Sequence, residues 1–196
     1  MARLGGSGRL TSSSSRGALV SVDGVNDKAV VDVARRAIGA IPRQRRGGVS
    51  VWDASGIFQD LAAADSEAGA PSARMLLLLY AADLAFRLRW EIRPAREEGR
   101  VVVAAPYVMT AVAVGRAAGL PGGWLRDLFR FAPPADEAKF VDTNGALASP
   151  SRGGFVEFGA IHLTGMNDAD VRHRLLEGAS AHLRAAARRH RASGKK

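Results

Sequence analysis

Cysteine is absent from this 196-residue chain. Without thiols the protein can form neither disulfide bonds nor a thiolate metal site, although this absence fits any redox compartment. The four histidines, which are His162, His173, His182 and His190, show no H-x-x-x-H spacing. We therefore expect no metal site. No apolar run approaches the roughly 18 residues that a membrane-spanning helix needs, so we also expect no transmembrane segment.

Acidic residues are missing from both ends of the chain, which carries a net charge of +9. Residues 1–17, rich in Gly, Ser and Arg, predict a flexible basic leader, or a mitochondrial targeting segment without a clear apolar face. Residues 188–196 form a basic tail, in which Arg188, Arg189 and Arg191 favour contact with a polyanion or acidic partner. Simple solvation of both tails is the alternative. We expect a cytoplasmic location, with a mitochondrial one as the alternative.

Aromatic residues are scarce, at 6% of the chain, and none interleaves with the basic runs. A stacking platform for single-stranded nucleic acid is therefore not indicated. Residues 18–187 are apolar enough for one globular domain. Strand-like runs at 18–22, 49–52, 100–104, 139–142 and 155–163 alternate with helical patterns at 28–41, 57–64, 108–118, 124–131 and 168–187. This alternation predicts an α/β domain with a parallel sheet.

A long amphipathic helix from Arg74 is the strongest local pattern. One apolar face is spaced for a helix and contains Leu77, Ala81, Leu84 and Leu88. Charged residues lie between these positions: Asp83, Arg87, Arg89, Glu91 and Arg93. Pro94 should kink or tighten the end of the helix, and Gly99 should end it in a left-handed conformation. The run at 100–104 then suits a central strand.

These residues also carry a resemblance to thymidylate kinases. The matching segments are Tyr80-Ala81-Ala82-Asp83-Leu84, Pro94-Ala95, Gly99, Val101-Val102-Val103 and Ala105-Pro106-Tyr107. In the family the corresponding segments are an F-A-A-D-R helix, Pro-Ala, a glycine, an apolar strand and Asp-Arg-Tyr. The resemblance implies a three-layer P-loop-kinase-like sandwich with a five-stranded parallel sheet. It also implies a homodimer formed through helices, which the apolar run Leu76–Leu79 would support.

This sequence lacks most of the residues that form the phosphate-binding loop of the family. That loop has the pattern G-x-x-x-x-G-K-[ST], in which backbone N–H groups and a lysine hold phosphates and a hydroxyl holds Mg²⁺. Gly24 takes the first glycine position, but Ala29, Val30 and Val31 take the positions of the second glycine, lysine and hydroxyl. Lys28 could replace the lysine only in a loop two residues shorter.

The other chemistry-bearing positions of the family have changed as well. Ala105 and Pro106 replace the Asp-Arg pair, Leu84 replaces the arginine of A-A-D-R, and no arginine follows the second strand. The lid, expected between Asn144 and Gly154, keeps one arginine, Arg152, and looks truncated. What remains of a degenerate nucleotide site is Gly24, Asn26, Lys28, Asp83 and Tyr107. For Asp83 we expect a helix-surface or capping role, and for Tyr107 packing.

Together these changes predict a catalytically inactive, thymidylate-kinase-like protein that serves as a scaffold or binding module. We expect no catalytic residues and no cofactor, and a protein partner or larger assembly. The alternative is a divergent kinase that transfers phosphate from ATP, with Mg²⁺, to dTMP. A module that senses a nucleotide without turnover is a further alternative.

Overall fold

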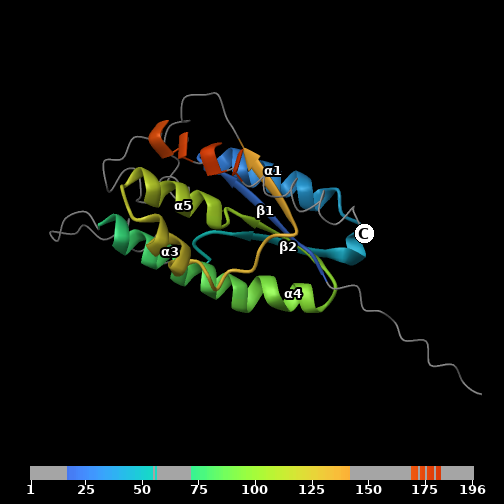
Figure 1. Ribbon diagram of the computed structural model, residues 1–196. Helices are drawn as coiled ribbons and strands as arrows, with labels where there is room; N and C mark the ends of the chain where they lie inside the picture. Colours follow the sequence, from blue (N-terminus) through green and yellow to red (C-terminus); the bar gives the residue numbers. More distant parts are fainter. Residues whose placement is uncertain are drawn as a thin grey trace, which may run out of the picture.

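Four parallel strands form the sheet of this protein (Figure 1). The computed structural model describes residues 17–54, Gly56, 72–141 and most of 169–181. The strands are β1 (Leu19–Gly24), β2 (Arg46–Val51), β3 (Val101–Ala105) and β4 (Glu137–Val141), in the order β2-β3-β1-β4. Every pairing is parallel, which confirms the predicted α/β class with a parallel sheet. The fifth strand, expected at 155–163, lies outside the described residues.

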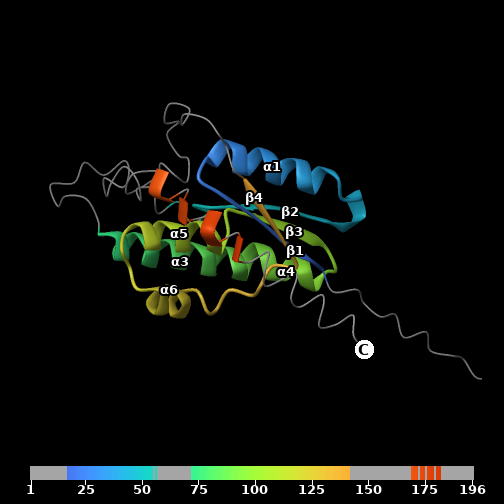
Figure 2. The same cartoon turned by 45° about the horizontal axis from the view of Figure 1, so that its top comes forward.

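Helices cover both faces of the sheet, so the described part has three layers (Figure 2). Helix α1 (Asp27–Gly39) packs on one face and touches all four strands. The other face is covered by α3 (Ala73–Arg87), α4 (Arg93–Glu97) and α5 (Val108–Ala117), and α6 (Gly122–Leu128) packs on α5. The helical residues between 169 and 181 lie against α5, since Gly178 sits beside the Met109 side chain.

The two central strands are buried along their whole length. All residues of β1 and β3 are buried, as the unbroken apolar run Val101–Ala105 predicts for a strand covered on both faces. The second strand differs from the sequence prediction, because β2 begins at Arg46 and not at Val49. Its first residues are paired with β3 through an irregularity between Arg46 and Gly48. Glycines have low strand propensity, and this is why the sequence pattern placed these residues in a loop.

One continuous helical segment runs from α3 to α4 through a π-helical turn, η2 (Leu88–Ile92). The predicted apolar face is confirmed, because Leu77, Ala81, Leu84 and Leu88 are all buried. Pro94 is the second residue of α4 and so lies just after the π-helical turn. The wider π-helical turn relieves the clash between the proline ring and a preceding carbonyl. Gly99 ends the helix at φ 76°, in the left-handed conformation that the sequence predicts.

Some expected segments lie outside the described residues: the short helix at 57–64, the lid at 144–154 and both basic tails. Within residues 17–54, 72–141 and the parts of 169–181 that are described, no helix is long and apolar enough to cross a membrane. The same residues contain no group of three or more His, Cys, Asp or Glu side chains that could hold a metal ion.

Candidate functional site

The candidate site lies at the carboxyl ends of β1, β2 and β3. In open parallel sheets, ligands bind outside the carboxyl ends of the strands, at the point where the strand order reverses. Here that point lies between β1 and β3, because β2 and β4 lie on opposite sides of this central pair. A cluster of buried polar side chains occupies it: Asp23, Ser50, Asp83, Arg87, Tyr107 and Thr110.

The connection between β1 and α1 is short. Strand β1 ends at Gly24 and α1 begins at Asp27, so only Val25 and Asn26 lie between them. Asn26 caps the helix: its side chain accepts a hydrogen bond from the Ala29 N–H at 2.9 Å, and its carbonyl accepts from the Val30 N–H at 2.9 Å. A phosphate-binding loop needs several free N–H groups that converge on an open site. In this turn the N–H groups of Ala29 and Val30 are used in capping the helix.

The space beside Gly24 is filled by the protein itself. The Gly24 N–H donates to Thr110 Oγ1 at 3.1 Å, and a Cβ at this position would approach the Val30 side chain to 2.7 Å and the Val141 Cβ to 3.0 Å. Val30 is fully buried. Lys28 points away from the site, since its side chain is 75% exposed and pairs with Asp32 at 2.7 Å.

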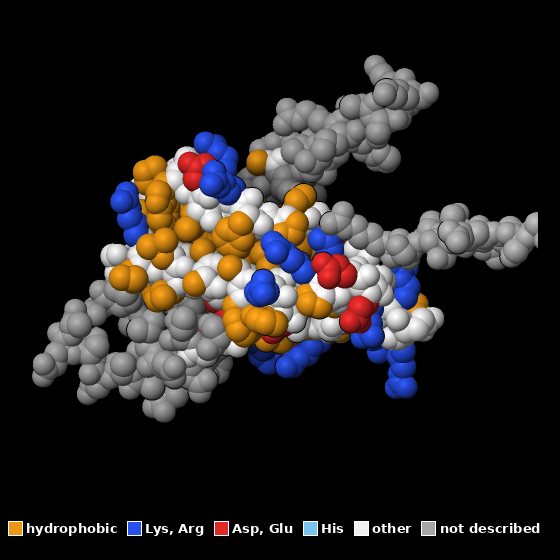
Figure 3. All heavy atoms as spheres, turned by 90° about the horizontal axis from the view of Figure 1, so that it is seen from below, with side chains coloured by type: hydrophobic (Ala, Val, Ile, Leu, Met, Phe, Trp, Pro, Cys, Tyr) orange, Lys and Arg blue, Asp and Glu red, His pale blue; other side chains and the backbone are white. Residues whose placement is uncertain are grey.

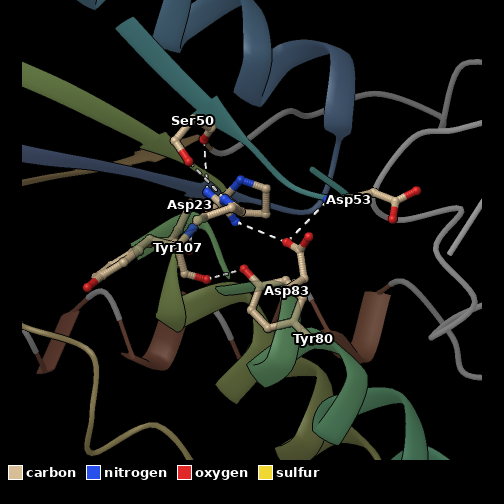
Figure 4. A network of polar contacts seen from close by, with 8 residues as sticks. Asp23, Ser50, Asp53, Tyr80, Asp83 and Tyr107 are labelled. Atoms are coloured by element: carbon tan, nitrogen blue, oxygen red, sulfur yellow. Dashed lines mark hydrogen bonds and ion pairs between the residues drawn. The ribbon is translucent and has the colours of Figure 1, made fainter. Parts of the chain in front are cut away.

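A single guanidinium holds the cluster together. Arg87 is fully buried. Its Nε donates to Ser50 Oγ at 2.9 Å, and its Nη2 donates to the carbonyls of Ser50 at 2.8 Å and Pro106 at 2.9 Å. Figure 4 shows Ser50, Asp83 and Tyr107 around this group. Arg87 therefore joins α3 to the end of β2 and to the segment after β3.

The sequence predicts a helix-surface or capping role for Asp83, and the surface position is wrong because Asp83 is fully buried. Its Oδ2 lies 3.8 Å from Arg87 Nη1 and accepts a hydrogen bond from the Asp53 N–H at 3.2 Å. The i, i+4 spacing of an acid and a base is typical of exposed helix pairs. Here both residues lie next to the apolar face, beside Leu84 and Leu88, and this face turns them inward.

Asp23 is a site residue that the sequence analysis did not identify: it lies just beyond the strand predicted at 18–22, belongs to β1 and is fully buried. Its Oδ1 accepts hydrogen bonds from the Tyr107 N–H, the Thr110 N–H and Thr110 Oγ1, each at 3.0 Å. Its Oδ2 has no hydrogen-bond partner among the described residues. Burial raises the pKa of Asp23 to about 6, against the opposing effect of these donors and of the Arg87 charge. The sequence signal that could have identified Asp23 as a site residue was an acid at the end of an apolar strand.

Aromatic side chains close the cluster on one side. The Tyr80 hydroxyl donates to the Tyr107 carbonyl, and the Tyr107 hydroxyl donates to the Pro133 carbonyl at 2.7 Å. Burial raises the pKa of both tyrosines above the usual range. Tyr80 also stacks on Trp52, with ring centroids 5.7 Å apart, and meets Phe129 edge-on at 6.0 Å. Tyr107 is 4% exposed and so takes the packing role that the sequence predicts.

The structure thus brings Gly24, Asp83 and Tyr107 to one place but leaves Lys28 outside it. Each polar side chain of the cluster is at most 4% exposed, and the guanidinium is bonded to protein oxygens. The charge of Arg87 is therefore met inside the protein by the carboxylate of Asp83. At the end of β3 the cis peptide joins Ala105 and Pro106, and neither residue offers a charge.

The architecture is that of a P-loop kinase. The crystal structure of thymidylate kinase from Ehrlichia chaffeensis matches this fold with a TM-score of 0.59, over 84% of this chain and 82% of that chain, at 12% identity. The protein therefore has a thymidylate-kinase-like fold, as the resemblance in its sequence implies.

Sequence similarity points to the same class over part of the chain. The chain is 36% identical over 84 residues to a probable thymidylate kinase of Pyrococcus abyssi, which covers 41% of each protein. It is 42% identical over 65 residues to a probable thymidylate kinase of Thermococcus gammatolerans, which covers 33% of this chain and 31% of that relative. The match thus spans less than half the length of these relatives. No protein family model matches the chain.

Replacing Arg87 should destabilise the protein strongly. Arg87→Met leaves the buried Asp83 carboxylate without its cation and the Ser50 and Pro106 carbonyls without a donor, so we expect a loss of about 3–5 kcal/mol. Arg89→Met, on the same helical segment but exposed over Trp90, should cost less than about 1 kcal/mol. Urea unfolding followed by circular dichroism measures both. Equal losses in the two variants would show that the Arg87 cluster is not important for stability.

Asp23 should make stability fall as pH rises between about 4 and 6. Its folded-state pKa of about 6 exceeds the ordinary 3.8, so the native state retains a proton that the unfolded state releases. This contribution is complete below about pH 4 and is lost as pH rises through 6. We expect Asp23→Asn, which cannot ionise, to gain about 2 kcal/mol relative to wild type between pH 4.5 and 7.5.

Urea unfolding of both proteins at several pH values measures this difference, because the other titrating groups are common to the two chains. The buried amide of the variant adds a cost that does not change with pH. A stability difference that stays constant with pH would show that Asp23 is ionised throughout.

Proposed function

We propose that this thymidylate-kinase-like protein does not transfer phosphate and keeps the fold as a scaffold or binding module. The observation that carries the proposal is the two-residue connection between β1 and α1. Its Gly24 N–H is bonded to Thr110, and the buried Val30 stands in the position of the phosphate-binding lysine. With the N–H groups of Gly24, Ala29 and Val30 already bonded, such a turn has fewer free donors than a phosphate-binding loop and lacks its cation.

The charges of the site support the same proposal. Phosphoryl transfer depends on cations and Mg²⁺ placed around the transferred group. Here Ala105 and Pro106 provide no charge at the end of β3, and the Arg87 guanidinium is held by Ser50, Pro106 and Asp83. A divergent dTMP kinase remains the second candidate, favoured by the partial similarity to proteins named probable thymidylate kinase. For that activity the β1–α1 turn would have to open and release Val30.

We expect the purified protein to transfer no phosphate from ATP to dTMP above background, because no described group is placed to bind the triphosphate. A coupled assay with Mg²⁺ measures this. Lys28→Ala is the informative variant and Lys139→Ala, on β4, is its control. Turnover that disappears in the Lys28 variant and persists in the control would favour the kinase. A thermal shift with dTMP but not with ATP and Mg²⁺ would favour a nucleotide sensor.

A homodimer, which the resemblance implies, is also proposed, but of the run Leu76–Leu79 only Leu78 belongs to the surface that would form it. Leu76 and Leu77 are 3% exposed and belong to the core. The exposed apolar stripe on α3 and η2 consists of Met75, Leu78, Phe86 and Trp90, which are 40–62% exposed. Figure 3 shows hydrophobic side chains gathered on this side of the molecule. Ala82 and Ala85 lie exposed between them, and their small size would let a second helix approach closely.

Placing a charge in this stripe should therefore separate the proposed dimer. Leu78→Glu would bury an unpaired carboxylate at the contact, and we expect the dissociation constant to rise about 100-fold. Val51→Glu, which places the same charge at a residue 40% exposed on the edge strand, should leave it nearly unchanged. Sedimentation equilibrium measures both variants. A wild-type protein that stays monomeric at high concentration would contradict the dimer.

A larger assembly and a polyanion bound by the basic tail are further partner proposals. Arg188, Arg189 and Arg191 lie outside the described residues, so these proposals rest on the charge of the sequence alone.

A further inference from the structure

A second basic surface lies on the folded domain, away from the buried polar cluster. Residues 33–52 contain five arginines and no acid. They form the last part of α1, the short helix η1 (Arg43–Arg45) and the edge strand β2. The turn between α1 and β2 stands at the end of the sheet where the strands begin, whereas the candidate site stands where they end (Figure 1). This surface is therefore independent of the nucleotide site of the fold.

Arg46 gives the turn a fixed shape. Its Nε donates to the Ile41 carbonyl and its Nη2 to the Gly39 carbonyl, each at 2.6 Å. The last carbonyls of a helix have no partner within the helix and form the negative end of its dipole. Arg46 satisfies the last of them, that of Gly39, together with the Ile41 carbonyl just beyond the helix, and places a positive charge at this negative end. Because the Arg45 N–H also bonds to the Pro42 carbonyl at 2.9 Å, the turn presents its remaining arginines from an ordered backbone.

Four arginines of this segment are exposed, and we call them the amino-end patch: Arg35, Arg36, Arg43 and Arg45. None of them forms an ion pair within the part of the chain that the structure describes. The acid of α1 nearest to these arginines is Asp32, which is hydrogen-bonded to Lys28; its pKa is lowered by that bond and also by the charges of Lys28, Arg36 and Arg35. Three acids at the amino ends of β3 and β4 are paired elsewhere: Glu98 with Arg100 at 3.0 Å, Asp136 with Arg96 at 3.2 Å and Glu137 with Lys139 at 2.5 Å. Arg43 and Arg45 therefore have no acidic partner among the described residues, and Asp32 compensates Arg35 and Arg36 only in part.

We propose that the amino-end patch binds the phosphate backbone of double-stranded nucleic acid, without reading its bases. Guanidinium groups match the geometry of phosphate oxygens and bind them with paired hydrogen bonds. Residues 33–51 contain no aromatic side chain, so the patch lacks the aromatic platform on which single-stranded bases usually stack. Between residues 35 and 48 the exposed residues other than arginine are polar or small, apart from Pro42, so this part of the surface has no large apolar group to insert into a bilayer.

The proposed contact has a characteristic salt dependence. A protein that neutralises about four phosphates should show a slope of about −3 to −4 for the logarithm of affinity against the logarithm of salt concentration. Contacts to phosphates carry no sequence information, so DNA and RNA duplexes of one length and random sequence should both bind. Fluorescence anisotropy with the full chain and labelled 20-base-pair duplexes, between about 50 and 200 mM salt, measures these quantities.

The decisive comparison uses two double variants with the same change in net charge. Arg43→Gln with Arg45→Gln removes half of the patch, and we expect affinity to fall at least about 10-fold at low salt and the slope to become shallower by about 2. Arg126→Gln with Arg130→Gln, at exposed positions on and just after α6, should change affinity less than about 3-fold. Thermal unfolding should be unchanged in both, since all four side chains are exposed.

Three results would overturn the proposal. Equal weakening by the two double variants would mean that only net charge matters. Loss of binding in an Arg188→Gln, Arg189→Gln, Arg191→Gln variant, with binding retained in the patch variant, would assign the contact to the tail. Tighter binding to phosphatidylglycerol vesicles or polyglutamate than to the duplexes, at equal charge, would identify a membrane or an acidic protein as the partner.

Discussion

The buried guanidinium of Arg87 holds together the carboxyl ends of the strands, where the polar cluster lies. It ties the middle of the long helical segment to Ser50 on β2 and to the Pro106 carbonyl beyond β3, and its charge is met by Asp83. Removing such a charge from water costs several kcal/mol, and only good geometry with its partners offsets this cost. The carboxyl ends of β2 and β3, and the aromatic residues around them, are placed by this one group.

The same contacts of Arg87 limit what the carboxyl ends of the strands can bind. In a site that binds phosphate, cations face the ligand, whereas here the cation faces protein oxygens. The cluster is not an optimised core, because Asp23 Oδ2 and Arg87 Nη1 are buried without hydrogen-bond partners among the described residues. Each such atom costs about 1–3 kcal/mol. The edge is therefore closed by polar groups of the chain at some expense in stability, and this supports the proposal that the fold serves binding.

The surfaces available for that binding are elsewhere on the domain. The stripe on α3 and η2 is apolar and lies on the solvent-facing side of the helices that cover one face of the sheet. The amino-end patch is cationic and lies at the end of the sheet opposite to the polar cluster. If the proposed dimer and the proposed nucleic-acid contact both form, two different chemistries on two separate surfaces would let both partners bind at the same time. Neither requires the β1–α1 turn to open.

The sequence by itself determined the features that depend on residues close together in the chain. The order of strands and helices, the buried face of Leu77, Ala81, Leu84 and Leu88, and the left-handed Gly99 follow from periodicity and glycine chemistry. Only the tertiary structure decided which charges are buried. Asp83 and Arg87 have the spacing of a surface ion pair, and Asp23 looks like part of a turn. Their burial depends on partners 37 residues away at Ser50 and 87 residues away at Thr110, which no local pattern contains.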